Sequence, residues 1–402
     1  MSSPETDPSE TAGEHVAALK AEASRAMHAG DPVQARVLLQ HAISLRGNDP
    51  GLWLNLAATN RACRDYAAAL AAVEQALRLA PRFFYALLMR ASLLEREGRI
   101  KAAAQAYAVA FTQAPADSQM DAATLQAVQH GRALYRKYQQ EMREYLDHVV
   151  PSASIGMRGG ESRRLAAFID STLGLKSRYR QEPTDYFYPG LPAIEFWERE
   201  EFPWLADLES ATPVIQRELA EVMRGDEGFA PYVDYPDGIP LDQWAALNRS
   251  LNWSAFHFFH HGRRYQENCR RCPNTMEMLA RVPQPQASGR MPAAMFSVLK
   301  PQTRIPPHNG VANVRLVLHL PLVVPAGCGF RVGSETREWR VGEAWIFDDT
   351  IEHEAWNTSD EVRVVLICDV WNPRLSAGER EAISAVMAAM DSFNEIVPKA
   401  DL

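Results

Sequence analysis

Two histidines and one arginine in the second half of the chain have the types and spacing of residues that bind a metal ion and an organic acid. His308 and His353 lie 45 residues apart, each at the edge of an apolar run typical of a β-strand, and Arg363 follows ten residues after the second histidine. Imidazole is a good ligand for ferrous iron, and two histidines from separate strands can occupy neighbouring coordination positions. Arginine offers a forked cation to a carboxylate. The pattern therefore favours a small barrel that holds iron(II) and a 2-oxocarboxylic acid, which is the chemistry of an oxygenase.

Short strands are expected to position these side chains. From about residue 186 the sequence is rich in tryptophan, proline and short apolar runs that are separated by turn signals. Strand candidates lie at 295–300, 314–322, 329–332, 336–340, 344–347, 353–357 and 362–371. Such a series of short strands without intervening helices predicts a jelly-roll or another barrel. An amphipathic run at 377–393 predicts a helix packed outside it.

Alternation along two of these strands predicts which side chains share a cavity, because every second residue of a strand lies on the same face. One face of the strand after His308 carries Arg315, Val317 and His319. One face of the last strand carries Arg363, Val365, Ile367 and Asp369. Buried charges are unfavourable without a partner, so a bound anion is expected beside these arginines.

At these residues the sequence resembles the aspartyl/asparaginyl β-hydroxylase family of iron(II)- and 2-oxoglutarate-dependent oxygenases. The resemblance covers the C-terminal half of the chain and is carried by several linked motifs in order. They are Glu267-Asn268-Cys269, His308-Asn309-Gly310, Asn313-Val314-Arg315 with His319-Leu320, the run 346–356, and Asp369-Val370-Trp371-Asn372-Pro373. The resemblance implies a double-stranded β-helix, which is a jelly-roll, cupin-like barrel, with flanking helices.

The same resemblance implies a role for each candidate site residue. His308 and His353 would bind Fe(2+). Ser297 and Arg363 would bind the distal carboxylate of 2-oxoglutarate, and His319 would lie near its C1 carboxylate. O2 would be the oxidant, with ascorbate as the reductant in vitro.

Arg315 would face the substrate and could hold a carboxylate, but two nearby positions depart from the usual family pattern. Most related oxygenases have Asp or Glu two residues after the first histidine, where this chain has Gly310. Some animal members also have glycine there, so activity is still expected, with water in the vacant corner. Asp349 is expected beside the metal, or in a turn, rather than as a ligand. Val317 replaces an arginine that the animal enzymes use near the cosubstrate and substrate, which argues against an animal-like choice of substrate.

The first part of the chain is repetitive. Small residues recur with a period of 34 in three registers, and larger residues and prolines follow the same period: Ala23, Ala57, Ala91; Ala35, Ala69, Ala103; Ala42, Ala76, Ala110; Leu39, Val73, Tyr107; Pro81, Pro115. Small residues let two antiparallel helices approach closely, and a proline ends the second helix of each unit. The pattern resembles tetratricopeptide repeats, most clearly in the middle unit with Trp53, Leu56, Ala57, Tyr66, Ala69, Ala76 and Pro81.

The expected organisation is a disordered tail at 1–14, about three tetratricopeptide repeats at 15–118, a helical linker at 119–185 and an oxygenase-like domain at 186–402. The linker helix is expected to break at Pro151 and at Gly159-Gly160. An all-α solenoid is thus followed by a jelly-roll barrel. Solenoids often take peptides in their concave groove, so a peptide or protein partner is expected there. The alternatives are a scaffold that packs on the oxygenase domain and a surface for dimerisation.

Composition and charge narrow the functional classes. Apolar residues make up 47% and charged residues 23%, and the net charge of −8 argues against a nucleic-acid partner. No apolar run approaches the ~20 residues that span a bilayer, and the acidic N-terminus is unlike a signal or transit peptide. Five scattered cysteines fit a reducing cytoplasm. The Cys269/Cys272 pair is interpreted as helix-turn packing rather than as a metal or redox site, and the histidines at 257, 260 and 261 as surface or structural residues.

The expected reaction is hydroxylation of a C–H bond, by resemblance at the β-carbon of an Asp- or Asn-like residue in a protein or peptide. One alternative is the same chemistry on a small molecule such as an amino acid, a lipid or a secondary metabolite, for which residues 1–118 would be dispensable. The other is a non-catalytic adaptor with a vestigial barrel. The joint retention of five site residues argues against the adaptor: Ser297, His308, His319, His353 and Arg363.

Overall fold

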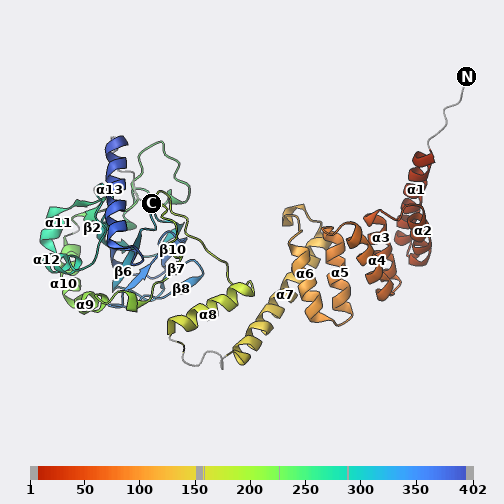
Figure 1. Cartoon of the computed structure of the whole chain (residues 1–402), viewed down its shortest axis with the longest axis horizontal. Coiled ribbons are helices and arrows are strands. Elements are labelled where there is room, and N and C mark those ends of the chain that lie inside the picture. The colour runs from red at the N-terminus through yellow and green to blue at the C-terminus, as the bar shows by residue number, and fades with distance from the viewer. Residues whose placement is uncertain (1–7, 151–156, 158, 226, 288, 395–402) are drawn as a thin grey trace, which may run out of the picture. The chain divides into compact units, whose positions relative to one another are not determined.

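The computed structural model describes residues 8–150, 157, 159–225, 227–287 and 289–394 (Figure 1). The chain divides into two compact units between Leu175 and Lys176, and each unit is described by itself. Within the described residues, no helix is both long and apolar enough to span a bilayer.

The first unit is built from antiparallel helix pairs. Its first six helices are α1 (Pro8–His28), α2 (Pro32–Leu45), α3 (Pro50–Ala62), α4 (Tyr66–Leu79), α5 (Phe84–Arg96) and α6 (Ile100–Phe111). Helices α2, α4 and α6 begin 34 residues apart, as do α3 and α5. The side chains of Asp31, Asp49 and Asp65 cap α2, α3 and α4 by accepting backbone N–H groups of the first turn.

The repeated small residues form the core of this unit. All nine alanines of the three registers are buried, and so are Leu39, Val73 and Tyr107. Small side chains at the crossing points let neighbouring helices approach closely, and the larger ones fill the space between the pairs. The predicted helical solenoid of three repeats is confirmed by these helices and their buried registers.

Two details of the helical unit differ from the sequence-based expectation. Helix α1 already begins at Pro8, so 8–14 are helical rather than part of a disordered tail, while residues 1–7 lie outside the described residues. Helix α7 (Ala122–Val149) ends where the helical pattern was expected to stop, but the glycine pair then begins a new helix, α8 (Gly159–Thr172), instead of lying in the break. Glu161 in its first turn favours a helix start there, because negative charge is stabilised at a helix N-terminus. Pro151 lies outside the described residues.

The second unit contains two antiparallel sheets. The larger sheet has the order β1-β2-β4-β11-β6-β9, with β3 on the side of β2, and the smaller has the order β5-β10-β7-β8. The strands are β1 (Phe229–Pro231), β2 (Trp253–His260), β3 (Arg263–Arg264), β4 (Ala294–Leu299), β5 (Thr303–His308), β6 (Arg315–Val323), β7 (Cys328–Val332), β8 (Glu335–Arg337), β9 (Trp345–Phe347), β10 (His353–Asn357) and β11 (Arg363–Trp371).

The two sheets enclose one of the hydrophobic cores of this unit. Val317 and Val365 of the larger sheet share this core with Ile305, Phe330 and Ala355 of the smaller one. The other face of the larger sheet packs against a group of short helices (Figure 1), which are α9 (Leu205–Ser210), α10 (Thr212–Arg224), α11 (Gln266–Arg271) and α12 (Pro273–Leu279). The final helix α13 (Ala377–Asn394) packs on a third cluster through Ile383 and Met387. A jelly-roll type of fold with flanking helices is therefore confirmed.

All seven strand candidates are present, but β1, β2, β3 and β5 were not predicted. Strand β2 is buried along most of its length and carries no polar alternation. Strand β5 contains Pro306 and Pro307, which a sheet tolerates because β5 is an edge strand.

The stretch that leads into the barrel also belongs to it. The backbone N–H of Glu182 donates to the carbonyl of Thr350 (2.8 Å), and the N–H of Thr184 donates to that of Gly310 (3.1 Å). Residues 176–185, which were expected to be part of the helical linker, thus lie in the second unit and hold the loops beside His308 and His353.

Candidate active site

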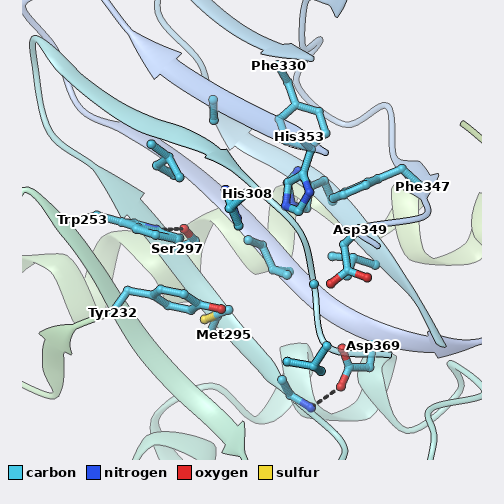
Figure 2. A pocket seen from close by; sticks show the side chains of 18 of the residues that line it. Tyr232, Trp253, Met295, Ser297, His308, Phe330, Phe347, Asp349, His353 and Asp369 are labelled. Atoms are coloured by element: carbon cyan, nitrogen blue, oxygen red, sulfur yellow. Dashed lines mark hydrogen bonds between the residues drawn. The ribbon is translucent and has the colours of Figure 1, made fainter. Parts of the chain in front are cut away.

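The two predicted metal ligands face one another inside the barrel. His308 ends β5 and His353 begins β10, and the two residues are direct partners across these antiparallel strands. Their ring centroids are 4.0 Å apart. Figure 2 shows both rings in the cavity, with Asp349 and Trp253 close by. Pairing of β5 with β10 therefore brings together two histidines that are 45 residues apart in the sequence.

Both histidines have one ring nitrogen directed at the backbone. Nδ1 of His308 lies 2.8 Å from the carbonyl oxygen of Pro306, and Nδ1 of His353 lies 3.1 Å from that of Ile351. A carbonyl oxygen can only accept, so Nδ1 carries the proton and Nε2 keeps its lone pair. Burial lowers the pKa of His308 to about 3 and that of His353 to about 4. Both rings are therefore neutral near pH 7, which is the form that binds a metal.

The same cavity also contains a buried arginine. The guanidinium of Arg363 is 1% exposed and lies 4.9 Å from the ring centroid of Trp339. Its Nε and Nη1 have no hydrogen-bond partner within the described part of the chain. Burial lowers its pKa to about 10, so it remains protonated at neutral pH. A buried guanidinium with unpaired donors is a site for an anion, because leaving the charge unpaired is unfavourable.

His319 and Ser297 line the same cavity. Nδ1 of His319 is buried and has no partner among the described residues, and the ring lies 5.0 Å from Phe330 and 4.8 Å from Phe347 between centroids. Oγ of Ser297 accepts a hydrogen bond from Nε1 of Trp253 (3.1 Å). The structure thus brings Ser297, His319 and Arg363 into one cavity with the two facing histidines.

Asp348 and Asp349 have different surroundings. The Asp348 carboxylate accepts hydrogen bonds from the backbone and hydroxyl of Thr350 and from Gln181, so it holds the turn before β10. Burial raises the pKa of Asp348 to about 6. Oδ2 of Asp349 accepts from Nη1 of Arg315 (2.9 Å), whereas its buried Oδ1 has no partner in the described chain. Of these two neighbouring residues, Asp349 is therefore the one that lines the cavity.

Arg315 lines the cavity, as alternation along β6 predicted, but two internal carboxylates engage it. Its Nη1 contacts Asp349 and its Nε lies 3.4 Å from Oδ1 of Asp369. Asp369 also accepts the backbone N–H of Ala293 (2.7 Å). A cation held between two carboxylates is already neutralised inside the protein.

Aromatic residues that line the cavity or contact His308 were missed by the sequence reasoning, because they lie in parts of the chain where no strand was predicted. Trp253 of β2 stacks on Tyr232 at 4.1 Å and lies 6.3 Å from the His308 ring, and Trp244 lies 5.1 Å from that ring, all between centroids. The aromatic density of residues 229–259 was the available signal. His257, on the same strand, is buried at 7% exposure, so it is a structural rather than a surface residue.

The cysteine pair lies apart from these lining residues. Cys269 and Cys272 are buried at the junction of α11 and α12, and Cys272 is the N-cap residue of α12. Within the described chain, no group of three His, Cys, Asp or Glu side chains could hold a metal ion by itself. A metal in the cavity would therefore have two histidines as its protein ligands, with other positions left for small molecules.

Comparison with known proteins shows a family whose members are similar to this part of the chain. Residues 209–373 match the family model described as aspartyl/asparaginyl beta-hydroxylase. The human aspartyl/asparaginyl beta-hydroxylase is 33% identical over 187 residues, which is 46% of this chain and 24% of that protein. The ornithine lipid ester-linked acyl 2-hydroxylase of Rhizobium tropici is 33% identical over 175 residues, which is 43% of this chain and 58% of that protein. The chain thus spans a quarter to three-fifths of the lengths of these relatives.

The helical unit is similar to the TPR domain of Arabidopsis OM64, with a TM-score of 0.28 and 19% identity, over 32% of this chain and 98% of that one. The repeat fold rests on the helices and buried registers described above. The family match at 209–373 contains β1 to β11 and therefore all the predicted site residues. Over residues 209–373 the C-terminal unit of this chain is therefore similar to the aspartyl/asparaginyl beta-hydroxylase family.

Proposed function

We propose that the C-terminal unit is an iron(II)- and 2-oxoglutarate-dependent dioxygenase that hydroxylates a C–H bond. The observation that carries the proposal is one cavity with two neutral, facing histidines and a buried arginine whose Nε and Nη1 have no hydrogen-bond partner among the described residues. Two relatives with about one third identity are named as hydroxylases, which supports the same class of reaction.

The residues present fit Fe(2+). His308 and His353 would bind it through Nε2, because Nδ1 of each ring faces a backbone carbonyl. Oδ1 of Asp349, which has no hydrogen-bond partner among the residues that the structure describes, would accept a hydrogen bond from a water that completes the site. This arrangement would supply a carboxylate beside the metal although position 310 is glycine.

The residues present also fit 2-oxoglutarate. Arg363 would pair with its distal carboxylate, together with the hydroxyl of Ser297, and His319 would lie near the C1 carboxylate. A dianion would satisfy the buried donors of Arg363, which the protein itself leaves unpaired among the described residues. Trp339 would hold the guanidinium plane from one side.

When bound, the metal and the keto acid would supply the oxidation of the C–H bond by O2, with release of succinate and CO2. The chain's own part is to orient the reactants and to exclude water. Ile305, Val317, Phe330 and Phe347 form apolar walls around the histidines.

Two substrate classes follow from the relatives, and both are proposals. The name of the human relative supports the β-carbon of an Asp- or Asn-like residue in a protein or peptide. The name of the Rhizobium relative supports the acyl chain of a lipid, as an instance of small-molecule chemistry. For a peptide substrate, the concave groove of the repeats would bind a peptide or protein partner. We place the reaction in the cytoplasm, since all five cysteines are free.

The test is succinate formation by the purified protein with iron(II), ascorbate, 2-oxoglutarate and O2. Slow turnover without substrate is expected, and it should vanish in the His308→Ala/His353→Ala double variant. Absence of both succinate and iron binding in a well-folded sample would reject the proposal and favour the adaptor. Removal of residues 1–118 then separates the substrate classes, because turnover of a small molecule should survive it.

A further inference from the structure

We propose that the outer face of helix α13 is a surface through which two copies of this chain associate, with the two helices antiparallel. This inference goes beyond the proposed function and does not depend on it, because α13 lies on the outside of the barrel (Figure 1). It is carried by the apolar residues on the exposed face of α13 and by their order along the helix.

Helix α13 has apolar residues on two faces. Ile383 and Met387 are buried in one of the hydrophobic clusters of the second unit. The opposite face is exposed, with Val386 at 57% and Phe393 at 88%. The exposed apolar residues of α13 are Ala382, Ala385, Val386, Ala389, Met390 and Phe393. A surface helix normally presents polar residues to water, so a contiguous apolar face of about three turns indicates a docking surface.

No charged residue interrupts this face. Asp391 is the one charged residue between positions 382 and 393, and it pairs with Arg290 of the barrel at 2.6 Å. The other charged residues of the helix are Glu379, Arg380 and Glu381, so α13 has three acids and one base. This balance argues against a lipid bilayer as the partner, because helices that lie on membranes typically carry Lys and Arg beside their apolar face.

Four residues of the face have the spacing of a helix–helix seam. Ala382, Val386, Ala389 and Phe393 follow one another at intervals of four, three and four residues. These are the intervals of the a and d positions in two helices that pack along one another. Small and large side chains alternate along the seam.

Antiparallel pairing of two copies would place each large side chain against a small one. With the two-fold axis between positions 387 and 388, Phe393 of one copy would meet Ala382 of the other, and Val386 would meet Ala389. In a parallel pair, Phe393 would meet Phe393 and Ala382 would meet Ala382, which crowds one end and leaves a gap at the other. Close packing therefore favours a second copy of α13 as the partner, in the antiparallel direction.

The interface would be small, so a weak dimer is expected. From position 382 to position 393 the face is about 18 Å long. Two such faces bury less than the roughly 800 Å² per partner of a standard interface. The Kd should therefore lie in the micromolar range.

Sedimentation velocity of the full chain at increasing concentration measures the association. The native protein should shift from monomer to dimer below about 0.5 mM. Val386→Asp and Phe393→Asp each place a charge in the seam of both copies and should raise the Kd at least about tenfold. Both positions are exposed, so the fold should be retained, which circular dichroism checks.

Val341→Asp is the matched control. Val341 is 49% exposed and lies between β8 and β9, so the same change adds a charge elsewhere on the second unit. Its Kd should equal that of the native protein.

Cross-linking tests the direction of the two helices. All proteins carry Cys63→Ser, which removes the one cysteine that is only partly buried. A short bismaleimide should join Ala382→Cys to Phe393→Cys in a mixture of the two variants. It should not join two copies of Ala382→Cys, because these positions would lie about 16 Å apart along the antiparallel helices.

Three results would overturn the inference. One is a native protein that stays monomeric up to about 0.5 mM, as expected if α13 packs on the helical unit of its own chain instead. Another is a dimer whose Kd is unchanged by both aspartate substitutions, which would place the interface on a different surface. The third is cross-linking of Ala382→Cys with itself, which would show parallel helices.

Discussion

The carboxylate of Asp349 occupies the space in which a side chain at position 310 would have to lie. A Cβ built on Gly310 would overlap the carboxyl group of Asp349. The backbone N–H of Gly310 donates to the carbonyl oxygen of Asp349 (2.7 Å), so the two loops are held together at this point. Glycine at position 310 therefore leaves room for the carboxylate of Asp349. In this arrangement the carboxylate near the histidines comes from the turn before β10 rather than from the loop after His308.

This contact predicts that Asp349→Ala restores the stability that is lost in Gly310→Asp. Gly310→Asp should lower the free energy of unfolding by about 1–3 kcal/mol, because the new side chain overlaps Asp349. In an Asp349→Ala background the same substitution should cost little and should restore a carboxylate near the metal. Chemical denaturation of the four proteins measures the coupling.

The control for this cycle is Gly225→Ala, whose Cβ would meet only the end of Arg271 at 3.8 Å. Asp349→Ala alone should weaken iron binding without abolishing it. Additive effects of the two substitutions on stability, or complete loss of iron binding with the fold intact, would contradict the assignment of Asp349.

Replacement of Arg363 should abolish stabilisation by 2-oxoglutarate without lowering the stability of the ligand-free protein. Arg363→Met removes a buried charge whose Nε and Nη1 lack a hydrogen-bond partner in the described part of the chain, so the protein without ligand should be at least as stable as the native chain. Saturating 2-oxoglutarate should stabilise the native protein by about 2.7 kcal/mol at 100 times its Kd, and the variant should lose this gain. Thermal unfolding with and without 2-oxoglutarate measures both effects.

Arg374→Met is the matched control, because Arg374 also lies over a tryptophan, at 5.5 Å from Trp197, but on the surface. Its response to 2-oxoglutarate should equal that of the native protein. An undiminished thermal shift in Arg363→Met would refute the cosubstrate role of Arg363.

The second unit should lose stability in mild acid through His257. Burial lowers the pKa of His257 from its ordinary 6.5 to about 4. Between pH 6.5 and 4 the unfolded chain therefore binds more protons than the folded one. The contribution of His257 to stability is fully present above pH 6.5 and falls with pH, by on the order of 3 kcal/mol at pH 4.

The variant His257→Gln cannot take up this proton, so its stability should decline less between pH 6.5 and 4. The difference in free energy of unfolding between the two proteins at pH 7.5 gives the packing effect of the substitution alone. Denaturation midpoints across this range check the prediction, and parallel pH profiles of the two proteins would show that His257 is not responsible.

In the helical unit, Gly131 allows close packing of α7 on Tyr107. A Cβ at position 131 would overlap the ring of Tyr107, whose hydroxyl donates to Glu95 (3.0 Å). Gly131→Ala should therefore lower the free energy of unfolding by about 1–3 kcal/mol, although alanine is the better helix former. Circular dichroism at a helix-sensitive wavelength follows the transition.

Gly13→Ala is the control within the same unit, because Gly13 lies in α1 with no neighbour within 4 Å of the new Cβ. It should be neutral or slightly stabilising. A stabilising Gly131→Ala would mean that Tyr107 can move aside and that the contact with α7 is not tight.

Local patterns in the sequence determined much of this architecture. The 34-residue period places Ala57, Ala69 and Ala76 at buried helix crossings, because a helical repeat puts equivalent residues in equivalent contacts. Alternation along β6 and β11 correctly predicts that Arg315 and Asp369 line one cavity. Strand β10 has the predicted bounds, His353–Asn357. Each of these features depends on periodicity within one element or one repeat.

The tertiary structure alone decided how the charged residues are paired. Arg315 comes from β6, Asp349 from the turn before β10 and Asp369 from β11. Asp349 and Asp369 lie 34 and 54 residues after Arg315, and no strand or helix period relates residues of this unit at these separations. The overlap of Gly310 with Asp349 and the docking of residues 176–185 onto the barrel are likewise contacts between distant segments. A sequence pattern specifies which face of a strand a residue occupies, whereas the partner across the cavity depends on how the sheets and loops pack in three dimensions.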